Sequence, residues 1–270
     1  MLPAVGQGTW DMEKADPAEA TRALLAGLDA GLTHVDTAEM YGDGRVEEWL
    51  GKALAGRRDE VFLASKVLPS NASRRETLAA CERSLKRLRT DTLDLYLLHW
   101  PGSHPLADTL AAFEELRAAG KVRHYGVSNF DASELREAVR LAPPGRIACN
   151  QVLYHLEERA IEHRVLPACR ELGVTLVAYS PFGSGRFPGP RSRGGRVLSE
   201  IASARGASAY AVALAFLLRE EEVVTIPKAA RREHVLENAA TGDLELTADE
   251  IARIEAVFPL GPEPASLPTI

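Results

Sequence analysis

The chain has 270 residues, of which 46% are hydrophobic, and its 32 Lys and Arg against 38 Asp and Glu give a formal net charge of −6. A chain of this length and hydrophobicity can bury a large core, which argues against a disordered protein and predicts a soluble globular one. The acidic balance argues against a protein whose main partner is nucleic acid or an anionic membrane.

Short runs rich in β-branched and aliphatic residues recur at intervals of about 30 residues, the length of one βα unit. In chain order, the predicted strands are residues 3–8, 33–36, 61–66, 93–99, 122–129, 147–151, 174–180 and 223–227. Helical patterns lie between most of these strands. One of them, residues 73–88, repeats apolar residues on one helical face, and Ser73 with Glu76 predicts a capping box at its start.

Eight βα units, with strands that are apolar on both faces, predict an α/β fold in which the parallel sheet closes into a (β/α)8 TIM barrel. An open doubly wound sheet is the competing layout, but no G-x-G-x-x-G motif follows the first strand. The longest interval, before the eighth strand, contains the Gly-, Pro- and Arg-rich stretch 183–196, which we predict to be a loop. No linker interrupts the repeat, so residues 1–270 are predicted to form one domain.

Neither the N-terminus nor the cysteines point to an exported protein. The first residues lack the cationic segment of a signal peptide, and the uncharged run 206–218 is shorter than the ~18 residues that span a bilayer. Cys81, Cys149 and Cys169 have no C-x-x-C spacing, which argues against a disulfide framework or a zinc site. We expect a cytoplasmic protein without a membrane anchor.

Nearly every predicted strand ends in a residue that could carry chemistry or contact a ligand. In a TIM barrel these C-terminal strand ends meet at one face and form the active site. The residues at this face are Gly8, Thr9, Trp10, Asp36, Tyr41, Lys66, His99, Ser128, Asn129, Gln151, Tyr179, Ser180 and Lys228.

Several kinds of barrel enzyme need groups that this set lacks. A glycosidase needs two carboxylates, whereas Asp36 is the single acidic residue at the predicted strand ends. A metal site is not expected, because only His34 and His99 are available as imidazole ligands near this face. A Schiff-base aldolase stays open as an alternative, since Lys66 and Lys228 both stand at strand ends.

Asp36, Tyr41, Lys66 and His99 together predict a tyrosine that donates a proton. A free tyrosine has a pKa of about 10, and a cation within ~4–6 Å makes it more acidic. Lys66 would be that cation, and Asp36 would keep it charged and oriented. His99 would form a hydrogen bond to a substrate carbonyl oxygen. Each residue alone has a structural explanation, such as a capping role for Asp36, so the hypothesis depends on the set.

Eight short motifs, in order along the chain, resemble those of the aldo-keto reductase family. They are GQGTW at 6–10, DTAEMYG at 36–42, Lys66, LHWP at 98–101, GVSNF at 126–130, NQ at 150–151, AYSP at 178–181 and IPK at 226–228. The resemblance implies a barrel that reduces aldehydes and ketones with NADPH, or with NADH as the alternative cofactor. It also implies that Tyr41 is the general acid, tuned by Lys66 and Asp36, and that His99 orients the carbonyl group.

The same resemblance implies a set of cofactor contacts. Ser128, Asn129 and Gln151 would bind the nicotinamide carboxamide, and Tyr179 would stack on the ring. The remaining expected contacts are Gly8, Thr9, Ser180, Phe182, Ser184, Lys228, Ala229, His234, Glu237 and Asn238. Residues 186–232 hold nine Arg and Lys against four Glu, so we expect the loop at 183–196 to fold over the anionic dinucleotide as a lid.

Ala229 and His234 depart from the resemblance, because NADPH-preferring members often carry a phosphate-binding Ser and Arg there. Arg231 or Arg232 is the expected substitute. The chain also starts at its first predicted strand, without the hairpin that usually covers the barrel floor, and it has a short segment after Phe258.

We therefore expect an open substrate pocket, lined by Trp10, Trp49 and Trp100. Such a pocket suits small carbonyl compounds, and a monomer is expected. A regulatory subunit that senses NADPH is the non-enzymatic alternative.

Overall fold

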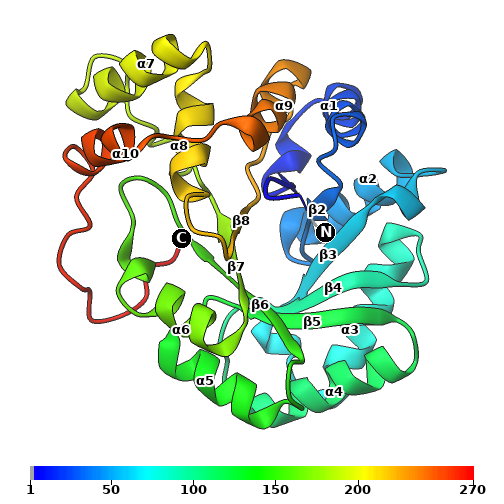
Figure 1. The fold of residues 1–270 in the computed structure, drawn as a ribbon. Helices are drawn as coiled ribbons and strands as arrows, with labels where there is room; N and C mark the ends of the chain where they lie inside the picture. The colour runs from blue at the N-terminus through cyan, green and yellow to red at the C-terminus, as the bar shows by residue number, and fades with distance from the viewer. Residues whose placement is uncertain (1–2) are drawn as a thin grey trace.

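A computed structural model describes residues 3–270, so the predicted domain boundary at Met1 lies outside the described residues. Within this range, eight parallel strands follow one another around a single sheet in chain order, with a helix after most of them (Figure 1). The strands are β1 (Gln7–Gly8), β2 (His34–Asp36), β3 (Phe62–Val67), β4 (Leu93–Leu98), β5 (Val122–Ser128), β6 (Ile147–Leu153), β7 (Thr175–Tyr179) and β8 (Val223–Thr225). All eight lie within or next to their predicted positions.

Backbone hydrogen bonds between the first and last strands close the sheet. The Gly6 amide donates to the Thr225 carbonyl oxygen at 2.7 Å, and the Thr225 amide donates to the Ala4 carbonyl oxygen at 2.8 Å. The two segments pass so close at Gly8 that a Cβ there would lie 2.4 Å from the Ile226 carbonyl oxygen. The predicted (β/α)8 barrel is confirmed, and the open doubly wound sheet is excluded.

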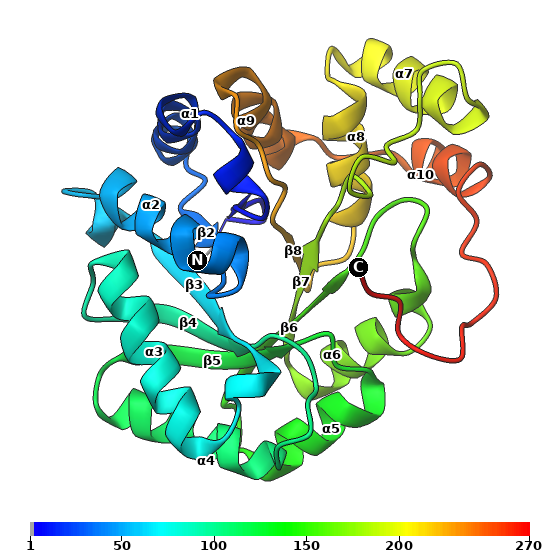
Figure 2. The ribbon, with the colours of Figure 1, turned by 180° about the vertical axis from the view of Figure 1, so that it is seen from behind.

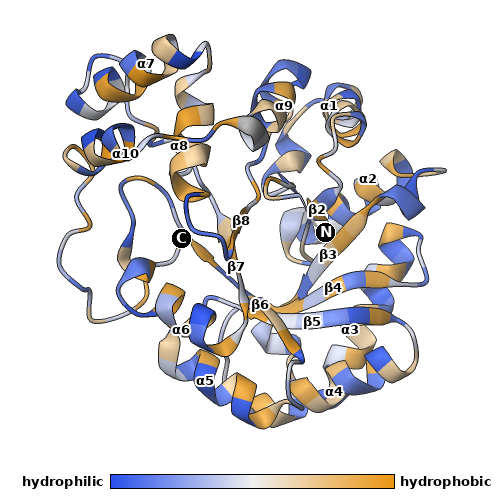
Figure 3. Ribbon diagram, viewed as in Figure 1, coloured by the Kyte–Doolittle hydropathy of each residue, from blue (hydrophilic) through white to orange (hydrophobic). Residues whose placement is uncertain are grey.

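Ten α-helices surround the barrel in residues 3–270, as the view from behind also shows (Figure 2). They are α1 (Pro17–Asp29), α2 (Arg45–Ala53), α3 (Arg74–Leu88), α4 (Leu106–Ala118), α5 (Ala132–Leu141), α6 (Val165–Leu172), α7 (Arg193–Arg205), α8 (Ala209–Leu217), α9 (Arg232–Ala239) and α10 (Ala248–Glu255). Hydrophilic and hydrophobic segments alternate along them (Figure 3), as expected of helices with one face on a core. No helix in this range is long and apolar enough to cross a membrane.

Two local predictions need correction. The Ser73 side chain accepts a hydrogen bond from the Glu76 amide at 3.3 Å, but Glu76 returns no bond to the Ser73 backbone, so only half of the capping box forms. The predicted loop 183–196 is too long, because α7 begins at Arg193. Ser192 is the N-cap of that helix and accepts from the Gly195 amide at 3.0 Å. The interval before β8 is long because it contains both α7 and α8.

The interior of the barrel is filled by side chains rather than open. Its apolar layer consists of Ala64, Leu95, Leu97, Cys149, Val177 and Ile226. Toward the N-terminal ends of the strands, the Phe62 ring meets His34 edge-on at 5.5 Å and stacks with His124 at 6.5 Å. Since β3 and β5 are not neighbours, this ring contact crosses the inside of the barrel. These rings lie near the N-terminal ends of the strands, on the side opposite the predicted site.

Candidate active site

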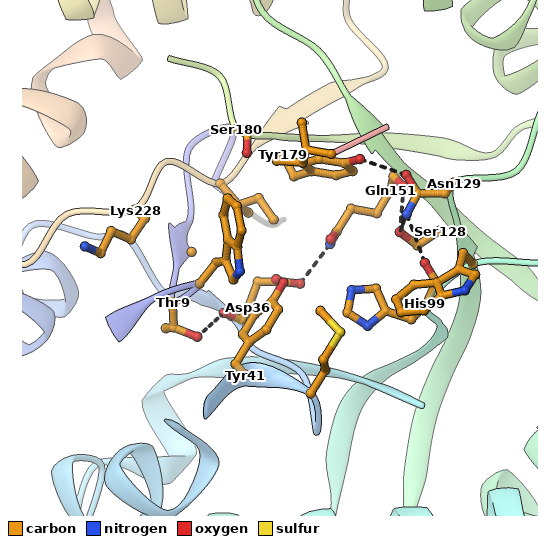
Figure 4. A pocket seen from close by; sticks show the side chains of 16 residues that line it. Thr9, Asp36, Tyr41, His99, Ser128, Asn129, Gln151, Tyr179, Ser180 and Lys228 are labelled. Carbon is orange, nitrogen blue, oxygen red and sulfur yellow. Dashed lines mark hydrogen bonds between the residues drawn. The ribbon is translucent and has the colours of Figure 1, made fainter. Parts of the chain in front are cut away.

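A cavity of about 140 Å³ opens at the C-terminal ends of the strands, over the filled barrel interior (Figure 4). It is lined by Gly8, Thr9, Trp10, Asp36, Met40, Tyr41, His99, Trp100, Ser128, Asn129, Gln151, Tyr179, Ser180, Ile226, Lys228 and Ile270. The predicted strand-end residues therefore meet at one site, with the exception of Lys66, which lies behind its wall.

Lys66 joins Asp36 and Tyr41 from that buried position. Its Nζ donates to Asp36 Oδ1 at 2.5 Å, to the Thr37 carbonyl oxygen at 2.8 Å and to Tyr41 Oη at 3.2 Å. All three ammonium protons therefore have an acceptor, and the Lys66 side chain is 0% exposed. A buried ammonium with this geometry is a fixed cation next to a phenol.

The local backbone explains how Tyr41 reaches Lys66. Asp36 ends β2 and lies beside Ala64 of β3, so the chain leaves the sheet close to Lys66. The Tyr41 amide then donates to the Ala38 carbonyl oxygen at 3.1 Å in a tight turn. Gly42 follows with a φ of 56°, a conformation that glycine adopts without strain. This turn folds the tyrosine back over the end of the strand.

The free site does not make Tyr41 more acidic than an ordinary tyrosine. Burial raises the pKa of Tyr41 above 10.0, and the charge of Lys66 acts in the opposite direction without reversing it. For Lys66, burial is the largest single effect and would lower the pKa, but the interactions with Asp36 and Tyr41 together outweigh it and raise the pKa above 10.5. The predicted acidifying effect of Lys66 on Tyr41 is present, but burial outweighs it, and the sequence does not reveal the extent of burial.

His99 is neutral in this environment. Burial lowers its pKa to about 2, and the charge of Lys66 acts in the same direction. Its ring lies 5.9 Å from the Tyr41 ring, and Nδ1 is buried without a hydrogen-bond partner among residues 3–270. A neutral imidazole next to the phenol can donate one hydrogen bond to an oxygen in the cavity.

A second set of polar side chains holds the opposite wall of the cavity. Gln151 Nε2 donates to Asp36 Oδ2 at 2.8 Å, so this predicted cofactor residue also fixes the carboxylate (Figure 4). Tyr179 Oη donates to Asn129 Oδ1 at 2.9 Å, and Asn129 Nδ2 donates to the His99 carbonyl oxygen at 3.0 Å. Ser128 Oγ donates to the Gln151 carbonyl oxygen at 2.8 Å. The amide and hydroxyl groups are thus oriented before any ligand binds.

The other predicted cofactor residues do not line this cavity. Phe182 and Ser184 lie in the loop after β7, where Ser184 Oγ donates to Ser180 Oγ at 3.0 Å. The remainder, Ala229, His234, Glu237 and Asn238, lie after β8 and on α9. Arg231 contacts His234 at 3.0 Å, so the arginine expected to bind phosphate lies next to the position where NADPH-preferring members often carry an arginine.

One further expectation fails, and part of the charge of the basic segment is engaged elsewhere. Trp49 does not reach the pocket, because its Nε1 donates to Thr21 Oγ1 at 3.0 Å between α2 and α1. The basic segment 186–232 is also less available than its charge suggests. Arg219 lies against the Phe216 ring at 4.0 Å and pairs with Glu162 at 3.0 Å, on the outside of the barrel. Arg205 pairs with Glu250 at 2.7 Å.

The sequence does not single out three of the lining residues, Met40, Ile226 and Ile270. The first two lie within the motifs at Tyr41 and Lys228, which are the signals that could have identified them. Ile270 comes from the segment after α10, which runs back to the barrel centre (Figure 1). Glu263 in this segment pairs with Arg164, which ties it to α6. The segment therefore narrows a pocket that we expected to be open.

Comparisons with known proteins agree with this geometry. The model of the aldo/keto reductase family matches residues 4–258. A methylglyoxal reductase of Escherichia coli is 47% identical over 96% of this chain and 92% of its own length. A glyoxal reductase of Bacillus subtilis is 35% identical over 98% of this chain and 94% of its own length. An aldo-keto reductase of Klebsiella pneumoniae, solved in complex with NADPH, superposes with a TM-score of 0.93 at 42% identity, covering 100% of this chain and 95% of that one.

Proposed function

This chain belongs to the aldo/keto reductase family, and we propose that it reduces the carbonyl groups of small aldehydes and ketones to alcohols with NADPH. The observation that carries the proposal is the Lys66 ammonium held between Asp36 and Tyr41, with neutral His99 beside the phenol. A neutral phenol with a cation behind it can release a proton to an oxygen that becomes negatively charged.

The residues of the site fit NADPH by the chemistry of their donors. Gln151, Ser128 and Asn129 offer amide and hydroxyl groups of both polarities, which suit a carboxamide. In the loop after β7, Ser180, Ser184 and Gly185 all have positive φ values, of 50°, 52° and 88°. Backbone amides in such turns converge and favour phosphate oxygens. No side chain lies within 4 Å of a Cβ built on Gly185, so this surface is open.

NADPH, when bound, supplies the hydride that reduces the carbonyl carbon. The residues of this chain would do the rest. His99 donates a hydrogen bond to the carbonyl oxygen and fixes its direction. Tyr41 gives its proton to the same oxygen, and the nearby Lys66 ammonium stabilises the phenolate that is left. Asp36 keeps that ammonium charged, and Gln151 fixes the second oxygen of the carboxylate.

The substrate class follows from the pocket and from the relatives. The cavity of about 140 Å³ has Trp10, Trp100 and Met40 at its mouth and admits a small carbonyl compound. The relatives named above act on methylglyoxal and glyoxal, so we propose short dicarbonyl compounds of this kind as substrates.

The Schiff-base alternative is not supported by the surroundings of the two lysines. A lysine nucleophile needs a free amine, whereas the pKa of Lys66 is raised and all three of its protons are hydrogen-bonded. Lys228 is exposed, which leaves it without the desolvation that activates such a lysine.

We further propose that residues 1–270 act as one domain and as a monomeric cytoplasmic enzyme. The closed hydrogen-bonding of the sheet and the presence of all proposed site residues in one chain support this. The three cysteines are buried and unpaired, as suits a reducing compartment.

The proposal is tested by incubating the protein with methylglyoxal, glyoxal and a panel of other small carbonyls while following the loss of NADPH absorbance. We expect turnover with the dicarbonyls, and slower turnover when NADH replaces NADPH. If the protein binds NADPH but does not oxidise it with any of the carbonyl compounds, the proposal of a reductase is contradicted. The alternative of an NADPH-sensing regulatory subunit is then favoured.

A further inference from the structure

Glu39 lies in the turn between Asp36 and Tyr41, yet it faces away from the cavity and is almost fully buried, with 8% exposure. Its carboxylate spans two loops. Oε1 accepts from the Leu68 amide at 2.8 Å and from Asn71 Nδ2 at 2.9 Å, in the loop after β3. The Glu39 amide donates to the Lys66 carbonyl oxygen at 3.3 Å. One residue thus joins the turn that carries Tyr41 to the strand that carries Lys66.

The loop after β3, which is hydrogen-bonded to the Glu39 side chain, also contacts the loop that follows His99. A Cβ on Gly102 would lie 2.7 Å from Cβ of Pro69, so the loop after β4, which follows His99 and Trp100, presses directly on the loop after β3. The loop after β3 is anchored from behind as well, because Thr109 Oγ1 of α4 donates to the Ala72 carbonyl oxygen at 2.6 Å. The loop after β3 is therefore held in place, and the hydrogen bonds of Glu39 connect the Tyr41 turn to it.

The distance that depends on these hydrogen bonds is the 3.2 Å between Tyr41 Oη and Lys66 Nζ. Tyr41 lies on a turn outside the sheet, whereas Lys66 lies within β3, and backbone hydrogen bonds join this turn to β3 as far as Glu39, two residues before Tyr41. The bonds of Lys66 to Asp36 and Thr37 fix the start of the turn. Beyond Thr37, the side chain of Glu39 makes the hydrogen bonds that join the turn to the neighbouring loop.

We propose that Glu39 is a positioning residue for the carbonyl reduction, which holds the Tyr41 turn against the β3 loop and so keeps the phenol within hydrogen-bond distance of Lys66. This inference rests on the proposed function of Tyr41. It assigns to Glu39 an effect on turnover rather than on binding of either substrate. Misplacing a reacting group by about 1 Å can cost on the order of 100-fold in rate.

The hydrogen bonds, rather than the charge, carry this role. Glu39 Oε2 is 3.9 Å from Arg83, a long contact to a side chain that is 45% exposed, and such a pair contributes little. Gln at this position keeps an acceptor oxygen for Leu68 and Asn71, whereas Ala removes it. The two substitutions therefore separate the acceptor from the charge.

Glu47 supplies a matched control. It is a buried glutamate on α2 that accepts from Ser65 Oγ at 2.6 Å and pairs with Arg87 at 2.6 Å, so it too joins the β2–β3 region to its neighbours. It makes no contact with the Tyr41 turn in these hydrogen bonds. We expect loss of this carboxylate to cost stability and to leave the distance between Tyr41 Oη and Lys66 Nζ unchanged.

The test compares steady-state kinetics, thermal unfolding and pH profiles of Glu39→Ala, Glu39→Gln and Glu47→Gln. We expect Glu39→Ala to lower kcat by about 10-fold to 100-fold with little change in NADPH affinity, and Glu39→Gln to restore most of the loss. The alkaline limb of carbonyl reduction moves to higher pH in Glu39→Ala, because a phenol farther from Lys66 holds its proton more tightly. Glu47→Gln lowers the melting temperature and leaves kcat and the pH profile unchanged.

If Glu39→Ala does not fold, Asn71→Ala removes one of the same hydrogen bonds and is expected to shift kcat and the pH limb in the same direction by less. If the Glu39 and Glu47 variants show the same drop in melting temperature and kcat is unchanged, Glu39 has only a structural role. A Glu39→Gln variant as slow as Glu39→Ala would assign the effect to the charge and overturn the proposal. Tyr41→Phe, measured alongside, tests the proposed function separately, since its turnover does not depend on Glu39.

Discussion

The catalytic residues and the segments expected to bind the outer part of the cofactor lie in different surroundings. On the catalytic side, Asp36, Lys66 and His99 are each less than 10% exposed, and the ammonium of Lys66 has a partner for every proton. On the cofactor side, the loop after β7 and the residues of α9 are largely exposed. Buried charges need a partner within the folded chain, whereas exposed charges are solvated by water until a ligand binds. Changes on the catalytic side are therefore expected to alter stability and turnover together, and changes on the cofactor side to alter binding alone.

The largest expected effect on stability comes from Asp36→Asn. It leaves the fully buried Lys66 without its charged partner, and breaking a buried pair costs about 3–5 kcal/mol. Urea unfolding measures this cost. The matched control is Glu171→Gln, which breaks the exposed pair with Arg136 and is expected to cost less than about 1 kcal/mol. Equal losses in the two variants would remove the contrast between the buried site and the surface.

A smaller effect is expected from His99 in acid. Since its pKa is about 2 in the folded protein and ordinarily 6.5, the unfolded chain takes up a proton below pH 6.5 that the folded chain refuses. Stability is therefore full above that pH and falls as the pH drops. From about pH 7 to about pH 5, this histidine alone accounts for a loss of about 2 kcal/mol.

The free energy of unfolding of His99→Gln, measured at both pH values, tests this contribution of His99. The variant should lose less stability in acid than the natural protein. An unchanged acid dependence in His99→Gln would mean that His99 is not held neutral by burial.

On the cofactor side, the expected effects are changes in affinity. Replacing Arg231 and Arg232 by Gln removes the guanidinium groups proposed to bind the 2′-phosphate. We expect NADPH affinity to fall by about tenfold, near 1.4 kcal/mol, with NADH affinity and the melting temperature almost unchanged. Titration calorimetry with both cofactors measures this. A parallel loss of NADH affinity would assign the arginines to another part of the dinucleotide.

The smallest effect concerns Arg191, Arg193 and Arg196 in and after the loop that follows β7. If this segment closes over the dinucleotide, NADPH affinity weakens with salt, and replacing the three arginines by Gln flattens that dependence. Affinity titrations at several ionic strengths measure the slope. A slope equal to that of the natural protein would leave the segment as a solvated surface.

The sequence predicts the barrel and the catalytic side because both follow from short-range patterns. Each strand is a local hydrophobic run, and parallel strands bring their C-terminal ends to one face, so Asp36, Lys66 and His99 must meet. Contacts between distant segments leave no such signal. Arg219 pairs with Glu162, which is distant from it in the sequence, and Ile270 lines the cavity although it lies at the far end of the chain. Trp49 points to α1 because of its position on α2, which a motif does not reveal.

The balance of opposing terms is equally hidden from the sequence. Proximity of Lys66 to Tyr41 was predicted, but the net direction of the tyrosine pKa depends on burial, and burial is a property of the folded site. The same holds for Gln151, whose amide is shared between the proposed cofactor wall and Asp36.

Tyr41→Phe tests most directly whether Tyr41 supplies the proton while other residues bind the cofactor. This substitution removes only the hydroxyl group that lies 3.2 Å from Lys66. We expect kcat for a dicarbonyl to fall by about 10²–10⁴ while the dissociation constant for NADPH changes little. Turnover close to that of the natural protein would contradict it.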